Sequence, residues 1–82
     1  MINDKKINKA IGAFLGGELR KRNITYAGLS IRLKERGLEY SASSLATKLY
    51  RGTFSAAFFL QCLIVIGYES AEINEIKKII TE

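Results

Sequence analysis

The stretch that decides the fold runs from Thr25 to Gly52 and reads TYAGLSIRLKERGLEYSASSLATKLYRG. Its first half predicts a helix over about residues 26–36, because Leu29 and Leu33 lie one helical turn apart. Thr25 is a residue type that caps helices, since its hydroxyl can accept a hydrogen bond from a free backbone N–H group.

A turn containing Gly37 leads to a second predicted helix over about residues 42–51. Ser41 can cap this helix, and Leu45 and Leu49 mark its inner face. Two short helices joined by a glycine-containing turn are the elements of a helix-turn-helix, whose second helix enters the major groove of DNA. The stretch therefore predicts a helix-turn-helix with residues 42–51 as the recognition helix.

Apolar residues at helical spacing predict three further helices, over about residues 5–22, 56–66 and 71–81. The chain contains no Pro, which favours helices joined by short turns. The expected N-caps are Asn3 or Asp4, Ser55 and Ser70. The expected apolar faces of the first and last helices are Ile7, Ile11, Phe14, Leu15 and Leu19, and Ile73, Ile76, Ile79 and Ile80. The sequence thus predicts a single all-α domain of five helices spanning residues 1–82. The helix over residues 56–66 is expected at its centre, and the last apolar face covers either the core or a second subunit.

Three details of these helices carry expectations of their own. Gly16 and Gly17 interrupt the first helix, which indicates either a close packing partner or a weak point. Phe54 and Phe59 flank the Ser55 cap at the spacing of a hydrophobic staple. The apolar surroundings of Cys62 favour a small core residue over a nucleophile.

Composition and sequence pattern exclude several function classes. The 82 residues include no His and a single Cys, so no Cys or Cys/His zinc site, intramolecular disulfide or His-based triad can form. No acid, base and nucleophile stand at a recognisable spacing, and we expect no enzyme activity, metal or cofactor. No stretch has the roughly 18 apolar residues of a membrane span, and the start lacks the apolar segment of a secretion signal. A cytoplasmic protein that does not contact a membrane is therefore expected.

The positive charge is concentrated in the first part of the chain. The whole chain has 13 Lys and Arg against 8 Asp and Glu, a net charge of +5. Residues 1–52 hold 11 of these cations and 4 acids, a net charge of +7, whereas residues 53–82 hold 2 cations and 4 acids, a net charge of −2. The basic part is where a polyanion is expected to bind.

The outer face of the recognition helix combines small polar and cationic side chains that can reach base edges or phosphates. The residues expected to contact DNA are Thr25, Tyr26, Tyr40, Ser41, Ser43, Ser44, Thr47, Lys48 and Arg51. For Tyr40, the sequence fits a packing role and a hydrogen bond to phosphate equally well. The cations of residues 20–22 and 32–36 lie at the C-termini of the expected helices. There they can compensate the helix dipole or contact a phosphate, and the sequence leaves both roles open.

The chain also resembles a known family over about residues 10–67. The run from Leu19 to Ser30, followed by Gly37 and then Leu45 to Gly52, is similar to the first three helices of the lambda-repressor and Cro group. More narrowly, residues 24–26 and 48–60 resemble a group of small uncharacterised bacterial domains of that superfamily. The resemblance implies a five-helix lambda-repressor-like DNA-binding domain, often a dimer and often a transcriptional repressor. Tyr26 stands where many members carry Gln, and the spacing from Gly37 to Gly52 is about three residues longer than usual. The sequence therefore places the residues that read bases only to within one helical step.

Together these features predict a sequence-specific double-stranded DNA binder, a homodimer that acts as a small transcriptional regulator. The alternative is a protein-interaction module that uses the same fold, with the apolar face of the last helix as its docking surface. A DNA-binding partner of a companion protein such as a toxin would combine the two interpretations.

Overall fold

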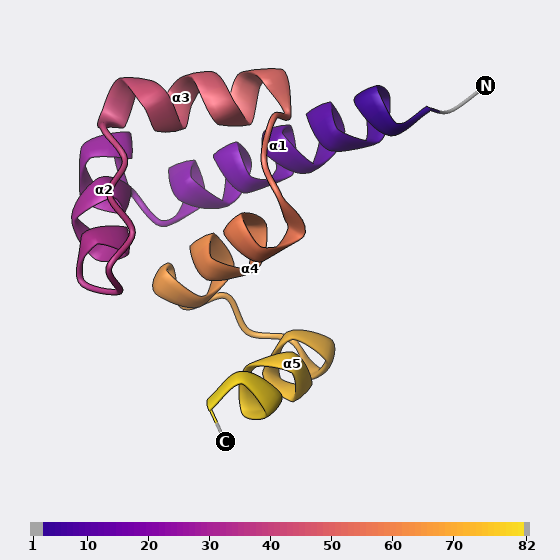
Figure 1. The fold of residues 1–82 in the computed structure, drawn as a ribbon, viewed down its shortest axis with the longest axis vertical. Helices are drawn as coiled ribbons and strands as arrows, with labels where there is room; N and C mark the ends of the chain where they lie inside the picture. Colours follow the sequence, from indigo (N-terminus) through magenta and orange to yellow (C-terminus); the bar gives the residue numbers. More distant parts are fainter. Residues whose placement is uncertain (1–2, 82) are drawn as a thin grey trace.

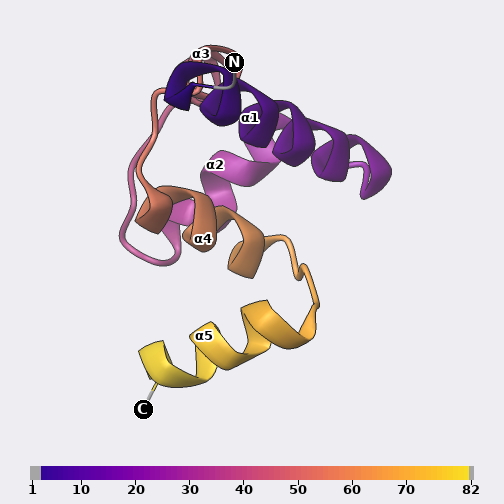
Figure 2. The same cartoon turned by 90° about the vertical axis from the view of Figure 1, so that its right-hand side faces the viewer.

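Five α-helices and no strand make up residues 3–81, the part of the chain that the computed structural model describes. The helices are α1 (Asp4–Lys21), α2 (Tyr26–Lys34), α3 (Ala42–Arg51), α4 (Ala56–Val65) and α5 (Ala71–Thr81). Figure 1 shows α3 running over α1 at one end of the molecule, with α2 beside them. The turned view in Figure 2 agrees that α5 lies at the opposite end from α3. The predicted all-α class and the five predicted helices are confirmed.

A polar residue directly before each helix caps it, because its side chain accepts a hydrogen bond from the backbone N–H group three residues later. The caps are Asn3, Thr25, Ser41, Ser55 and Ser70, with donor–acceptor distances of 2.9, 3.0, 3.1, 3.0 and 3.1 Å. For α1 the choice between two candidate caps is thus decided in favour of Asn3. These five bonds satisfy N–H groups that have no partner within a helix.

The helix ends also follow local chemistry. Asn23, Gly37, Gly52 and Gly67 all adopt positive φ angles, of 55°, 83°, 69° and 78°. Helix α2 ends at Lys34, two residues earlier than expected, because the residues that follow form a turn to Gly37. Helix α4 likewise ends one residue early, at Val65.

A leucine-rich core joins the first four helices. The buried apolar residues are Leu15, Leu19, Leu29, Leu33, Leu45, Leu49, Phe58, Cys62, Leu63 and Ile66. Burial raises the pKa of the Cys62 thiol to about 12, which keeps it protonated and unreactive at neutral pH. Phe54 and Phe59 stack at 6.2 Å between ring centroids, as the predicted staple requires. The expected roles of these three residues are confirmed.

Some residues expected in the core lie outside it. Ile7 and Phe14 are 45% and 42% exposed. Ile7 stands near the start of α1, before the residues of this helix that contact α3. Phe14 instead sits at the rim of the core, edge-on to Phe59 and Tyr68. Helix α4 supplies the buried residues Phe58, Cys62 and Leu63. It lies between the α1–α3 pair and α5 (Figure 2), and its main helix–helix contact is with α2.

Helices α1 and α3 share the most extensive helix–helix interface, and two glycines bring their backbones together. A Cβ atom added at Gly12 would lie 2.0 Å from the carbonyl oxygen of Leu49. A Cβ added at Gly52 would lie 2.7 Å from the carbonyl carbon of Asn8. At Gly16 and Gly17 the nearest atoms are side-chain ends 3.7 Å or more away. Of the two expectations for these glycines, the close packing partner is therefore wrong and the weak point stays a prediction.

The glycine contact predicts opposite effects for two substitutions in the same helix. Gly12→Ala should lower the free energy of unfolding by about 1–3 kcal/mol, because the new methyl group collides with the backbone of α3. Gly17→Ala is the matched control and should raise it by about 0.5–1 kcal/mol, because Ala favours the helix and finds open space. Urea unfolding followed by circular dichroism measures both values. Equal effects of the two changes would contradict the close backbone contact.

Candidate nucleic-acid interface

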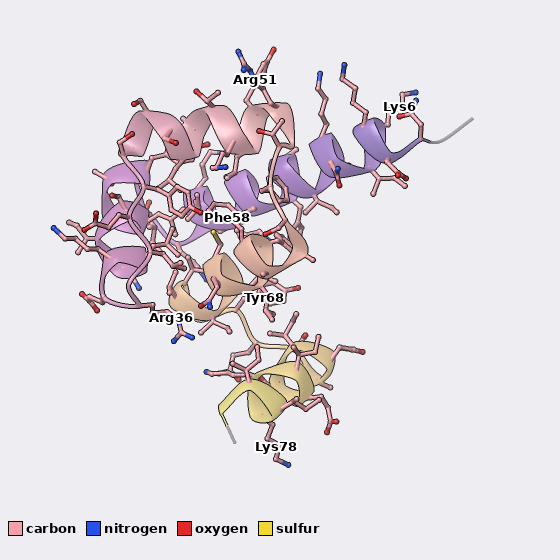
Figure 3. All side chains as sticks on the ribbon, viewed as in Figure 1. Lys6, Arg36, Arg51, Phe58, Tyr68 and Lys78 are labelled. Carbon is pink, nitrogen blue, oxygen red and sulfur yellow. The ribbon has the colours of Figure 1, made fainter. Side chains whose placement is uncertain are left out.

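The outer face of α3 is a polar strip opposite the buried leucines. Ser43, Thr47 and Arg51 are exposed and lie four residues apart, whereas Leu45 and Leu49 are 0% and 3% exposed. Figure 3 shows the Arg51 side chain pointing away from the body of the molecule. The strip thus presents two hydroxyl groups followed by one guanidinium group.

Hydrogen bonds within α3 orient the hydroxyl groups of this strip. The Oγ atom of Ser41 accepts a bond from the backbone N of Ser44 and lies 3.3 Å from the Oγ atom of Ser43. Thr47 donates its hydroxyl proton to the carbonyl oxygen of Ser43, over 3.0 Å. Because this bond uses the hydroxyl as a donor, its lone pairs stay available to an outside partner.

The side chain of Lys48 contacts the protein and is not part of the outer strip of α3. Its ammonium nitrogen lies 5.5 Å from the ring centroid of Tyr40 and 5.8 Å from that of Phe58, within cation–π range. The same nitrogen is 3.5 Å from the carbonyl oxygen of Thr53. Tyr40 is half-buried and packs edge-on against Phe58, with 5.2 Å between ring centroids. Both candidate residues therefore make packing contacts, and their contact with DNA stays a prediction.

The other two candidate residues stand at the start of α2. Thr25 is exposed, and its hydroxyl caps the helix. Tyr26 is half-buried and borders an open, mostly apolar hollow of about 540 Å³ between the end of α1 and the start of α2. Arg20 of α1 lines the same hollow. This end of α2 offers free N–H groups, a phenol and a guanidinium group close together.

Several cations that follow helix ends have partners within the protein. Glu18 is nearly buried and pairs with both Lys21, at 3.2 Å, and Arg22. Arg32 donates to the carbonyl oxygen of Val65 at the end of α4, over 3.0 Å. Arg36 donates to the side-chain oxygen of Gln61, also on α4, over 2.6 Å. The contacts of Arg32 and Arg36 join α2 and the turn after it to α4, whereas those of Glu18 stay within the end of α1.

Lys9 is a neighbour of α3 that sequence reasoning missed. Its ammonium nitrogen lies 6.0 Å from the ring centroid of Tyr50, which is itself 80% exposed. The two residues are far apart in the sequence, and the glycine contact between α1 and α3 brings them together. No local signal could have revealed this proximity.

Comparison with protein families matches residues 7–71 to a family described as a domain of unknown function, DUF6471. The chain belongs to this family. The DUF6471 match extends from the first half of α1 to the first residue of α5, so it includes every candidate DNA-contacting residue. No curated protein and no solved structure matches the chain.

Two further features concern metal binding and membrane crossing by the described residues of this DUF6471 chain. Within residues 3–81, His, Cys, Asp and Glu form no group of three or more that could hold a metal ion. Over the same residues, every helix is too short or too polar to cross a membrane.

The Glu18 pair predicts a specific pH dependence of stability. The hydrogen bond from Arg22 holds the pKa of the Glu18 carboxyl below its usual 4.5. The carboxylate therefore stabilises the fold above that value, and this contribution is lost as the pH falls through the lowered pKa. In thermal unfolding at several pH values, Glu18→Gln should melt below the wild type at pH 7 and lose less stability on acidification. An unchanged pH profile in the variant would contradict the pairing.

Proposed function

We propose that this protein binds double-stranded DNA sequence-specifically, with α2 and α3 acting as a helix-turn-helix of the lambda-repressor type. The observation that carries the proposal is the outer strip of α3, in which Ser43, Thr47 and Arg51 are exposed along one side of the helix. An α-helix with such a face fits the major groove, where each base pair presents a distinct pattern of donors and acceptors. The resemblance of residues 10–67 to the lambda-repressor and Cro group supports the same conclusion.

Short hydroxyl side chains suit the role of reading bases. Ser43 and Thr47 allow the backbone of α3 to approach the base edges closely. The Ser43 hydroxyl can donate or accept a hydrogen bond, and the Thr47 hydroxyl, whose proton is donated to the carbonyl oxygen of Ser43, can accept one. Arg51 stands at the end of the same face, where a phosphate at the edge of the groove is within its reach. Specificity then comes from the serine and threonine and affinity from the phosphate contacts.

The start of α2 provides a second phosphate contact in this proposal. The backbone N–H groups of a helix N-terminus carry a positive partial charge and bind phosphate oxygens. Thr25 and Tyr26 stand at that terminus, and Arg20 lies beside them across the hollow. Anchoring α2 on one strand holds α3 in the groove.

An apolar stripe on α5 favours a dimer. A dimeric DNA-binding domain of the lambda-repressor type fits the role of a small transcriptional repressor. Ile76, Ile79 and Ile80 are 42%, 72% and 47% exposed, so the last helix covers the core with only part of its apolar face. Acidic residues precede basic ones along α5, at positions 72, 75, 77 and 78. Two copies packed antiparallel would therefore place unlike charges opposite each other. The same exposed stripe is the observation that favours the second candidate function, docking of a companion protein.

Selection of bound sequences from a random DNA library tests the proposed function. We expect enrichment of a palindrome with half-sites about 34 Å apart, because a two-fold dimer reads two successive major grooves on one face of the duplex. On the selected site, Arg51→Ala should lower the slope of log affinity against log salt by about 0.9, the loss of one phosphate contact. Failure to enrich any sequence at low salt would contradict the proposal.

The dimer surface gives a separate prediction. Ile79→Ser combined with Ile80→Ser should convert a dimer into a monomer while circular dichroism stays that of the wild type, because both side chains are largely exposed. Ile31→Ser on α2 is the control, since Ile31 is 63% exposed but belongs to another helix. Analytical ultracentrifugation measures the mass. A wild-type protein that binds its palindrome as a monomer, or a double variant that stays dimeric, would contradict the role of α5.

A further inference from the structure

Three lysines at the start of α1 have no evident role in stabilising the helix. Lys5 and Lys6 lie in its first turn, and Lys9 follows one turn later. The N-terminus of a helix carries a positive partial charge, so cations there are unfavourable. Within residues 3–81, both ion pairs use Glu18, and neither includes one of these three lysines.

The remaining cations of the described chain stand where a helix favours them or next to a protein partner. Positively charged residues occur in the last turns of α1, α2, α3 and α5, where the helix dipole is negative. Arg22 and Arg36 lie just past helix ends and bond to Glu18 and Gln61. Lys5 and Lys6 are therefore the exception, and they form the lysine cluster together with Lys9, whose ammonium group lies near the exposed ring of Tyr50. An external anion would explain why cations stand at the start of this helix.

The fold holds this lysine cluster next to the recognition helix. Gly52, which ends α3, contacts the backbone of Asn8 and Lys9 so closely that an added Cβ would lie 2.8 Å from the Lys9 nitrogen. The Lys9 ammonium group is near the exposed ring of Tyr50, at the same end of α3. The position of the cluster relative to α3 is thus determined by backbone contact.

The cluster and the outer strip of α3 share one side of the molecule. In Figure 3 the labelled side chains of Arg51 and Lys6 both point outward from the side that bears α3 and the first half of α1. Residues three and four positions apart lie on one face of a helix, so Lys5 and Lys6 share a face with Lys9. Cations from two helices therefore line the end of the recognition helix.

We infer that Lys5, Lys6 and Lys9 form a second phosphate-binding edge for double-stranded DNA, beside the C-terminal end of α3. This inference rests on the proposed function and extends it to a helix outside the helix-turn-helix. With α3 in a major groove about 12 Å wide, a phosphate backbone at the edge of the groove passes the end of α3. Lys9 stands beside Tyr50 at that end, and the side chains of Lys6 and Arg51 point outward there (Figure 3). Contacts of this kind raise affinity for every sequence equally.

The test compares two double variants that remove the same charge. Lys6→Gln with Lys9→Gln should lower the salt slope of binding to a short random-sequence DNA duplex by about 1.8, because two phosphate contacts are lost at about 0.9 each. Lys77→Gln with Lys78→Gln removes two charges from α5, at the far end of the molecule, and should change the slope by much less. Fluorescence anisotropy of the labelled duplex over a series of salt concentrations gives the slopes. Thermal melting checks that both variants stay folded.

The outcomes separate this inference from the proposed function. A larger slope change for the α1 variant than for the α5 variant, with the preference for a selected site over random DNA unchanged, is the expected result. Equal slope changes in the two variants, with the wild type still binding, would overturn the phosphate-binding edge alone. Absence of any wild-type binding to duplex at low salt would overturn both.

Discussion

The contact between Gly12 and the backbone of Leu49 is the constraint on which the rest of this structure depends. No side chain larger than hydrogen fits at Gly12, because a Cβ atom would overlap the Leu49 carbonyl group. The missing side chain lets α1 and α3 approach closely enough for Leu15 and Leu45 to be fully buried. It also determines which residues of α1 stand beside α3. Packing and the arrangement of the charged surface therefore have one origin.

Features that depend on near neighbours in the chain could be predicted from the sequence. The caps at Thr25 and Ser41 and the left-handed residues at Gly37 and Gly52 follow from chemistry within four positions. Leucine spacing predicted the inner faces of α2 and α3 for the same reason. The class of the fold and its five helices result from such local signals.

Features that depend on the lengths and crossing of helices could not be predicted in this way. Periodicity placed Ile7 and Phe14 in the core, but it carries no information on which part of a helix face meets another helix. The sequence indicated either a close packing partner or a weak point at Gly16 and Gly17, whereas the crossing of α1 and α3 places the close approach at Gly12. Likewise, the aromatic rings that attract Lys48 come from elsewhere in the chain, so its direction follows only from the packed structure.

Part of the charge of +5 serves helix stability. Cations at helix C-termini offset the helix dipoles, and Arg32 and Arg36 also join α2 and the turn after it to α4. The proposed DNA-binding surface uses charges beside the start of α2 and the end of α3. The last helix adds no positive charge to that surface and instead presents the apolar stripe assigned to a second subunit.

The central claim is that the face bearing α3 meets DNA, and NMR titration tests it most directly. A ¹⁵N-labelled protein is titrated with a short random-sequence duplex while the amide signals are followed residue by residue. The account predicts the largest shifts at the start of α2, along the outer face of α3 and in the first half of α1, with little change in α5. Shifts centred on α5, or no shifts at low salt, would contradict it.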